Sequence, residues 1–358
     1  MKPHGVLSDQ HCHNWSMFSK RLESGVNSRL QITLDEMKRA AVEVKKAGGD
    51  TLFFAGDLFH TRGSMDPEVF NPTHATIKEI LASGVRIYAI PGNHDNKDQD
   101  TTELGNAIQT IGGLDGFTVV TSPYVFQSGL ADRQPVVMIP WCRDLKGLRE
   151  AVDEIRGAIA DRDEMDLIIH AGIDGVLSGV PAHGLTSAEI ASWGFKRVFA
   201  GHYHHHCVFE GGRVISIGAL NHQTFSDVGT KAGFLIVHED RVEYRATHAP
   251  LFVDVTADTE EDELPLIADG NYVRVRSMKL TAEQARYFRA DLEGMGAKGV
   301  IFDAIREEAV ARSRSAASSA PSLEASVANY VDAMGVDDPA AVKAGCLDVL
   351  TFVRSASV

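Results

Sequence analysis

Residues 85–95 read VRIYAIPGNHD, a strand-like apolar run that ends in a glycine followed by Asn93, His94 and Asp95. Four other segments repeat this design and place polar side chains directly after an apolar run: Asp9-Gln10-His11, Gly56-Asp57-Leu58-Phe59-His60, Ile169-His170 and Gly201-His202-Tyr203-His204. In an open α/β sheet, the loops that follow the strands gather at one edge and form the functional site. The repeated design therefore predicts a layered α/β fold with one site at such an edge.

The side chains in these segments are those that bind divalent cations. Carboxylate and amide oxygens are hard ligands and imidazole nitrogens are borderline ligands, so together they suit a pair of divalent metal ions. Two such ions held close together form a centre for phosphoester hydrolysis. We interpret seven residues as the ligands: Asp9, His11, Asp57, Asn93, His170, His202 and His204.

The spacing within the segments supports shared ligation. Asp9 and His11 are two residues apart, as are His202 and His204, so in extended backbone each pair lies on one face. A paired-metal site needs a bridging carboxylate, and Asp57 is the reasonable bridge. Three segments begin with a glycine that we expect to turn the backbone sharply off the strand end: Gly56, Gly92 and Gly201.

A single motif of this kind carries little weight, because an isolated histidine after a strand is usually a loop or core residue and Gly-Asp is usually a turn. The metal interpretation depends on all five segments occurring together. For His13, His205 and His206, which extend two of the segments, we expect exposed loop imidazoles.

The composition is that of a globular protein. At 358 residues, the chain has room for one large catalytic core and a smaller appended unit. No apolar run is long enough to span a membrane, and the N-terminus runs straight into the first strand, so we expect a cytoplasmic protein without a signal peptide or a membrane partner. The four cysteines lie far apart and predict reduced thiols: Cys12, Cys142, Cys207 and Cys346.

The net charge of -14 argues against a broad basic surface for nucleic acid. It does not exclude a nucleic-acid enzyme, because two divalent cations bring four positive charges against the carboxylates of Asp9 and Asp57. We therefore expect the centre itself to attract a phosphodiester.

Strand and helix patterns alternate through the first part of the chain, and a capping box at Thr33-x-x-Glu36 predicts the start of the first helix. Three later strands without intervening helices, at 214–217, 233–237 and 242–245, predict a second, more antiparallel sheet. We divide the chain into a catalytic domain at 1–250, a β-α-β capping domain at 251–308, a flexible linker at 309–322 and a helical element at 323–358. The helical element has two apolar stripes and is either a docked tail or a partner-binding element.

The motif set resembles that of the calcineurin-like metallophosphoesterase superfamily, whose pattern is D-x-H, G-D, G-N-H-[DE], H and G-H-x-H, over about Val6 to Val237. Within it, residues 56–62, 216–227 and 233–235 resemble the nuclease subunit of the SbcCD-type exonuclease, particularly its compact phage versions. The chain differs from that family in having Cys12-His13 where Leu-Gly is usual and in lacking a proline near Ala219.

This resemblance implies a four-layer α-β-β-α metallophosphoesterase sandwich with a small α/β capping domain and C-terminal helices. It implies 3′-5′ exonuclease and single-strand endonuclease activity on DNA, in repair and recombination, with the C-terminal helices bound to an SMC-like ATPase. It also implies a homodimer and a location in the cytoplasm, that of the host if the chain is phage-encoded.

The same resemblance implies how the ligands divide. One ion would have Asp9, His11, Asp57 and His204 as ligands, and the other Asp57, Asn93, His170 and His202. Manganese is the expected metal, with magnesium or iron as alternatives. As a mechanism, we expect His94 to protonate the leaving sugar oxygen, His60 to position the scissile phosphate, and Asp95 to orient a histidine.

Two other functions remain open at the level of sequence. One is a phosphodiesterase for a cyclic or other small nucleotide, and the other is a non-catalytic scaffold for DNA or the ATPase. The complete ligand set disfavours the scaffold. Protein serine/threonine phosphatases are also disfavoured, because they have Asp-Arg-Gly after Gly-Asp and glutamate at the position of Asp95.

Overall fold

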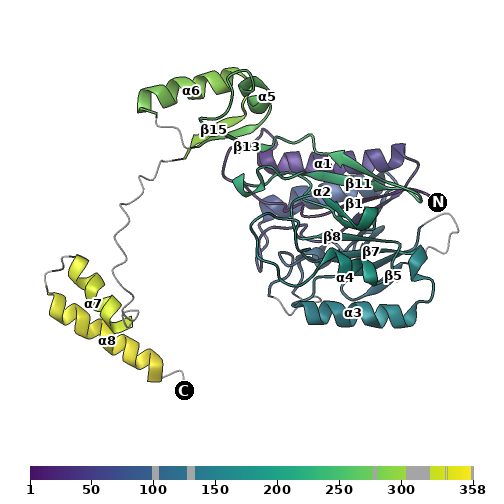
Figure 1. Ribbon diagram of the computed structural model, residues 1–358, viewed down its shortest axis with the longest axis horizontal. Coiled ribbons are helices and arrows are strands. Elements are labelled where there is room, and N and C mark those ends of the chain that lie inside the picture. The colour runs from purple at the N-terminus through teal and green to yellow at the C-terminus, as the bar shows by residue number, and fades with distance from the viewer. Residues whose placement is uncertain are drawn as a thin grey trace. The chain divides into compact units, whose positions relative to one another are not determined.

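The computed structural model describes residues 1–98, 105–126, 134–276, 280–303, 323–334, 336 and 338–355. The chain forms two compact units, Met1–Ala304 and Ile305–Val358 (Figure 1). The predicted linker at 309–322 lies outside the described residues, and the predicted domain boundaries stay predictions.

The first unit contains two six-stranded sheets within its described residues. In spatial order, the first sheet consists of β12 (Val242–Ala246), β11 (Gly233–Val237), β1 (His4–Leu7), β2 (Thr51–Phe54), β3 (Arg86–Ala89) and β4 (Phe117–Val119). The second consists of β5 (Tyr124–Phe126), β6 (Val136–Ile139), β7 (Asp166–His170), β8 (Arg197–Gly201), β10 (Val214–Ser216) and β9 (Cys207–Phe209). The strands β1 to β4 are parallel, as are β6, β7, β8 and β10, and the remaining strands pair antiparallel at the edges.

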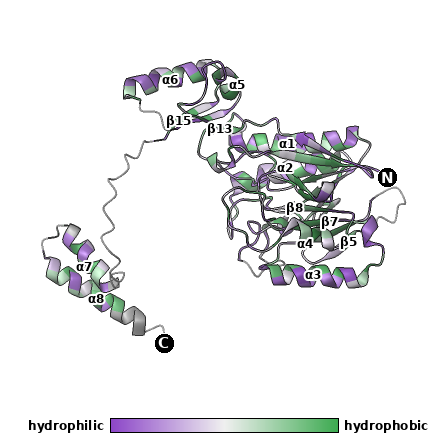
Figure 2. Ribbon diagram, in the orientation of Figure 1, coloured by the Kyte–Doolittle hydropathy of each residue, from purple (hydrophilic) through white to green (hydrophobic). Residues whose placement is uncertain are grey.

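Helices cover the outer face of each sheet. Figure 1 shows α1 (Ser28–Lys46) and α2 (Pro67–Ala82) beside the first sheet, and α3 (Leu145–Ala158) and α4 (Ser187–Ser192) beside the second. Figure 2 shows that hydrophilic and hydrophobic residues alternate along α1 and α3, as expected for helices with one buried face. The predicted four-layer α-β-β-α sandwich is confirmed.

Apolar side chains fill all three spaces between the layers. One cluster packs α1 and α2 on the first sheet, another packs α3 and α4 on the second, and a third lies between the sheets. The central cluster includes the fully buried Phe53, Phe199 and Leu235. Burial of each such side chain contributes about 1.5–3 kcal/mol, so the two sheets are held in a fixed relation at the edge where their loops meet.

Two sequence predictions about these layers are wrong. Helix α1 begins at Ser28, because the Asn27 side chain accepts hydrogen bonds from the backbone N–H groups of Arg29 and Leu30. Thr33 is therefore inside the helix, where its hydroxyl donates to the Arg29 carbonyl oxygen. The three later strands also form no separate sheet, since β10 pairs with β8 in the second sheet and β11 pairs with β1 in the first.

The remainder of the first unit is a small α/β layer. Its sheet has the parallel strands β13 (Phe252–Val255), β14 (Tyr272–Val275) and β15 (Gly299–Phe302), with α5 (Leu264–Ala268) and α6 (Ala282–Gly294) in the connections. The β-α-β arrangement predicted from the sequence is confirmed. Phe18 joins this layer to the loop after β1, because its ring stacks on Tyr272 with centroids 4.9 Å apart.

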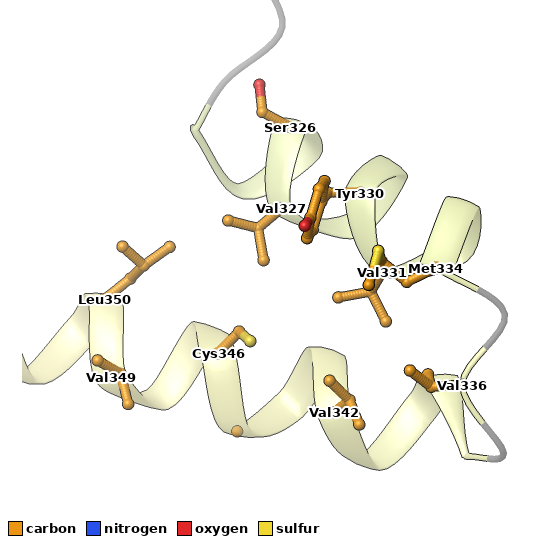
Figure 3. Close-up of a pocket in the computed structure, with 11 residues that line it drawn as sticks. Ser326, Val327, Tyr330, Val331, Met334, Val336, Val342, Cys346, Val349 and Leu350 are labelled. Atoms are coloured by element: carbon orange, nitrogen blue, oxygen red, sulfur yellow. The ribbon is translucent and has the colours of Figure 1, made fainter.

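The second unit is a helical hairpin of α7 (Leu323–Met334) and α8 (Pro339–Ser355). Figure 3 shows apolar side chains of the two helices facing each other around a cavity of about 770 Å³. Val331 is buried, but Tyr330 and Val349 remain 66% and 62% exposed, so the hairpin leaves much of its apolar surface uncovered. In the described part of the chain, no helix has the length and apolar character needed to cross a membrane, and the four cysteines are unpaired.

Acid sensitivity of the fold is predicted from His4 in β1. This side chain is 4% exposed and its Nε2 has no hydrogen-bond partner among the described residues; burial, together with Arg197 and His238, lowers its pKa to about 3. The unfolded chain takes up the proton near pH 6.5, so stability falls as the pH drops from about 6.5 towards 3, by about 1.4 kcal/mol per pH unit.

The His4→Phe variant is expected to lose the part of the pH dependence of stability that comes from His4. Between pH 7 and pH 5, its free energy of unfolding in urea should fall by about 2 kcal/mol less than that of the wild type. Parallel pH profiles for the two proteins would contradict the assignment.

Candidate metal centre

The five polar segments meet where the parallel strands of the two sheets end. Asp9 and His11 follow β1, Asp57 follows β2 and Asn93 follows β3, all from the first sheet. The other three predicted ligands come from the second sheet, where His170 ends β7 and His202 and His204 follow β8. All seven predicted ligands therefore lie at one edge of the sandwich.

The seven side chains form two neighbouring groups. In one, ligand atoms of Asp9, His11 and His204 lie within 4.8 Å of one another, and in the other those of Asp57, His170 and His202 do the same. Asn93 joins the second group, because its Oδ1 is 3.1 Å from His170 Nε2 and 3.0 Å from His202 Nδ1. These groups have the residue types and the spacing of a paired-metal site.

Asp57 belongs to the second group and also lies close to the first. Its Oδ2 is 3.6 Å from Nε2 of His11 and 3.4 Å from Nε2 of His170, while its Oδ1 accepts a hydrogen bond from the His94 backbone N–H. The side chain is 1% exposed. One carboxylate is thus placed to serve both groups.

His94 and His60 lie beside the first group. Their rings are stacked with centroids 5.2 Å apart, and each lies about 5 Å from the His11 ring, at 4.8 and 5.1 Å. His94 Nδ1 is 2.7 Å from the backbone carbonyl oxygen of His60, so this nitrogen carries a proton and donates it. This hydrogen bond fixes the orientation of the His94 ring and does not involve Nε2.

The glycines act mainly by their small size. A Cβ at Gly56 would meet His170 Nδ1, one at Gly92 would meet Asp57 Oδ1, and one at Gly201 would meet Ser8 Oγ. Of the three, Gly56 alone has a positive φ, of 100°, so a backbone conformation that requires glycine occurs at that position, while turn or bend residues directly follow Gly92 and Gly201. Several predicted ligands have the strained, positive φ values that are unusual outside glycine: Asp9, His11, Asp57 and His202.

A comparison with protein-family models matches residues 4–206 to the calcineurin-like phosphoesterase family. The chain belongs to this family. It is a metal-dependent phosphoesterase whose His and Asp clusters form a dimetal site, and the matched residues include all seven predicted ligands. A comparison with curated proteins finds no match.

Solved structures that match this chain include a dimetal phosphatase from Danio rerio, 12% identical, with a TM-score of 0.44 over 68% of this chain and 95% of the other. They also include the Pseudomonas putida nuclease MPE, 15% identical, with a TM-score of 0.30 over 68% of this chain and 87% of the other.

The donor set of this phosphoesterase fits divalent metal ions. Asp9 Oδ1 is buried without a hydrogen-bond partner among the described residues, which is costly for a carboxylate unless a cation is bound nearby. The Nε2 atoms of His11 and His204 lie 3.3 Å apart. Two nitrogens of this kind converge naturally on a shared cation, because a neutral imidazole presents a lone pair there.

Burial favours the neutral form of several of the phosphoesterase's site histidines, and the neutral imidazole is the form that binds metal. Burial and the nearby His170 lower the pKa of His202 to about 3, and burial with the neighbouring imidazoles lowers the pKa of His60 to about 4. Two ligand histidines differ: burial is outweighed by Asp57 at His170, where the pKa rises to about 9, and by the hydrogen bond to Asp227 at His204, where the pKa is also raised. A metal ion and a proton would therefore compete beside Asp57.

Asp227 is a functional residue that sequence reasoning missed. Its Oδ1 is 2.8 Å from His204 Nδ1, and its Oδ2 accepts hydrogen bonds from the backbone N–H groups of Gln223 and Thr224. Gln223 in turn donates through Nε2 to the Asp9 carbonyl oxygen. This carboxylate fixes the His204 ring so that Nε2 faces the centre. In the sequence, Asp227 falls at the end of the stretch 216–227 that resembles the SbcCD-type nuclease subunit.

Asp95 does not orient a histidine as predicted. Its carboxylate accepts hydrogen bonds from the backbone N–H groups of Leu58, Phe59 and Gly92, and thereby ties two ligand loops together. Burial, with the charge of Asp57, raises its pKa to about 7.

The three additional histidines are outside the seven-residue set, and none is fully exposed. His206 stacks on Tyr244, His205 Nδ1 accepts from the Lys231 backbone N–H, and His13 packs against the His60 ring. The prediction of exposed loop imidazoles is therefore wrong for all three.

The Asp227→Ala variant is expected to bind metal about 10- to 100-fold more weakly, because the His204 ring loses the acceptor that orients it. The measurement is titration of metal-free protein with Mn²⁺. Asp258→Ala, which removes an exposed carboxylate, serves as the control and should bind like the wild type. Equal affinities for all three proteins would exclude the orienting role.

Proposed function

We propose that this phosphoesterase is a manganese-dependent DNA nuclease, with 3′-5′ exonuclease and single-strand endonuclease activity. The observation that carries the proposal is the pair of ligand groups that share Asp57. Two divalent cations separated by a bridging carboxylate are suited to in-line displacement at a phosphodiester. The choice of DNA rests on the motif resemblance to SbcCD-type nuclease subunits.

The proposed ligands follow the two groups. Asp9, His11, Asp57 and His204 would bind one cation, and Asp57, Asn93, His170 and His202 the other. When bound, the pair supplies an activated water and neutralises charge on the phosphate. The neutral amide of Asn93 keeps the centre from becoming too negative to accept a phosphodiester.

His94 is the proposed general acid. Its Nδ1 donates to the His60 carbonyl oxygen, so a proton taken up on Nε2 can pass to the leaving sugar oxygen. His60 is proposed to hold the scissile phosphate. Its Nδ1 lies 3.2 Å from His11 Nδ1, and if His11 binds metal through Nε2, its Nδ1–H donates to His60 and leaves His60 Nε2–H as a donor for the substrate.

The test of this function compares two substrate classes. The purified protein with Mn²⁺ is incubated with labelled duplex and single-stranded DNA, and separately with a cyclic dinucleotide. Mononucleotide release from DNA alone supports the proposal. Hydrolysis of the cyclic dinucleotide alone would establish the small-nucleotide phosphodiesterase in its place, and loss of activity with EDTA confirms the metal requirement.

The helical hairpin is proposed to bind the coiled coil of an SMC-like ATPase. Its uncovered apolar residues, including Tyr330 and Val349, support this role because isolated helix pairs bury such faces against a partner.

The variants Tyr330→Asp and Val349→Asp should abolish binding to an ATPase of this kind from the same genome. The control Asp348→Ala, which changes an exposed residue of α8 next to Val349, should bind it like the wild type. If the wild-type chain does not bind the ATPase, or if both aspartate variants bind it as well as the wild type does, the hairpin is not the binding site.

A further inference from the structure

Two half-buried tryptophans lie beside the metal centre, one next to each ligand group. The Trp15 ring is 4.6 Å from the His60 ring, which neighbours His11 of the first group. The Trp141 ring is 5.3 Å from the His202 ring of the second group. The third tryptophan, Trp193, is 4% exposed and belongs to the core between α4 and the second sheet, so packing explains that residue but not the other two.

The loop that carries Trp15 is fixed to the metal centre. The Arg29 guanidinium lies 5.1 Å from the Trp15 ring centroid, and Arg29 Nη2 donates to the carbonyl oxygen of Gln223 at 2.5 Å. Gln223 donates through Nε2 to the Asp9 carbonyl oxygen at 2.9 Å. Asn27 Nδ2 also donates to the Trp15 carbonyl oxygen at 2.9 Å. A side chain placed this firmly keeps a constant position relative to the ligands.

Trp141 is fixed to a different ligand loop. Its backbone N–H donates to the Pro91 carbonyl oxygen at 3.0 Å, directly before Gly92 and Asn93. Its Nε1 is buried and has no hydrogen-bond partner among the described residues. A third aromatic side chain, Tyr203, also lies beside this ligand group, with its ring 5.2 Å from that of His202.

Neither tryptophan can bind a metal or transfer a proton at neutral pH, so the hydrolytic chemistry does not use them. Half-buried indoles next to a phosphodiester-cleaving centre have the properties of base-stacking side chains, because every nucleobase has a planar face. We propose that Trp15 and Trp141 stack on the nucleobases that flank the scissile phosphodiester, one on each side. The proposal rests on the proposed nuclease function and narrows its substrate to a locally unpaired strand.

The strand must be unpaired because bases inside a duplex already stack on their neighbours. A small cyclic mononucleotide has a single base and can use one of the two positions at most. Stacking at both positions therefore disfavours a cyclic mononucleotide, because the cleaved bond needs a nucleotide on either side.

The experiment uses three short single-stranded oligonucleotides with one cleavable phosphodiester each: one intact, one lacking the base on its 5′ side, and one lacking the base on its 3′ side. On the intact strand, Trp15→Ala should lower kcat/KM about tenfold to a hundredfold, because stacking contributes about 1–3 kcal/mol per base. Trp15→Phe should stay near the wild-type value.

On the strand that lacks one of the two bases, Trp15→Ala and the wild type should have equal kcat/KM. On the strand that lacks the other base, Trp141→Ala and the wild type should have equal kcat/KM. An equal loss on all three strands would show a merely structural role and overturn the proposal. So would wild-type rates in both alanine variants, or sensitivity of both to the same base.

A second measurement separates this proposal from the nuclease function. The protein with Mn²⁺ bound is mixed with a thymidine oligonucleotide whose linkages resist hydrolysis. This strand should quench the tryptophan fluorescence of the wild type and of Trp193→Phe, and should quench that of Trp15→Phe and Trp141→Phe less. Unchanged quenching in both of the latter, or none in the wild type, contradicts stacking. A wild-type protein that binds this way but cleaves no strand would refute the nuclease function alone.

Discussion

Asp57→Asn is expected to lose bound metal and to lower phosphodiester cleavage by about a thousandfold or more. The Asp57 carboxylate belongs to the second ligand group and also lies close to the first, with its Oδ2 3.6 Å from His11 Nε2 and 3.4 Å from His170 Nε2. An amide at this position carries no charge to offset two cations, and metal ions supply several kcal/mol of transition-state stabilisation. Elemental analysis after gel filtration should show less than one bound metal per chain, against two in the wild type.

The matched control is Asp35→Asn, which removes an exposed carboxylate on α1 that pairs with Lys38. This variant should keep both the metal and the activity. Full metal content together with wild-type cleavage in Asp57→Asn would show that another group bridges the centre.

His94→Ala is expected to separate metal binding from catalysis. His94 belongs neither to the ligand group of Asp9 nor to that of Asp57. Its ring lies 4.8 Å from the His11 ring and is oriented by the His60 carbonyl oxygen. The variant should keep its metal and lose about 10²- to 10⁴-fold in kcat, the usual contribution of a positioned general acid.

The control for this variant is His74→Ala, which removes a histidine of α2 that packs on Phe70 instead of on the centre. It should cleave DNA at the wild-type rate. A His94→Ala protein that cleaves normally would exclude the general-acid role, and one that has lost its metal would make His94 a ligand.

Local sequence patterns predicted the site better than they predicted the assembly of the sheets. The five segments after strand-like runs were sufficient to find all seven candidate ligands, because the ends of parallel strands gather loops at one edge whatever the pairing order. Pairing order depends on contacts between distant residues, such as Val6 with Leu235 across β1 and β11, and no local pattern records it.

The errors at finer scale have the same origin. Thr33 and Glu36 have capping-box spacing, but Asn27 caps α1 earlier and the Glu36 carboxylate binds Arg39 instead. Asp95 adjoins the ligand Asn93, yet its hydrogen bonds go to the backbone of two loops. Asp227 contacts His204 across 23 positions of sequence, so only the folded chain brings the two together.

The central claim is that one carboxylate joins two neighbouring cation sites, and anomalous diffraction measures this directly. A crystal of the protein grown with Mn²⁺ and measured at the manganese absorption edge should show two peaks, one among Asp9, His11 and His204 and the other among Asn93, His170 and His202, with Asp57 touching both. A single peak that Asp57 does not contact, or no peak at saturating Mn²⁺, would contradict the account.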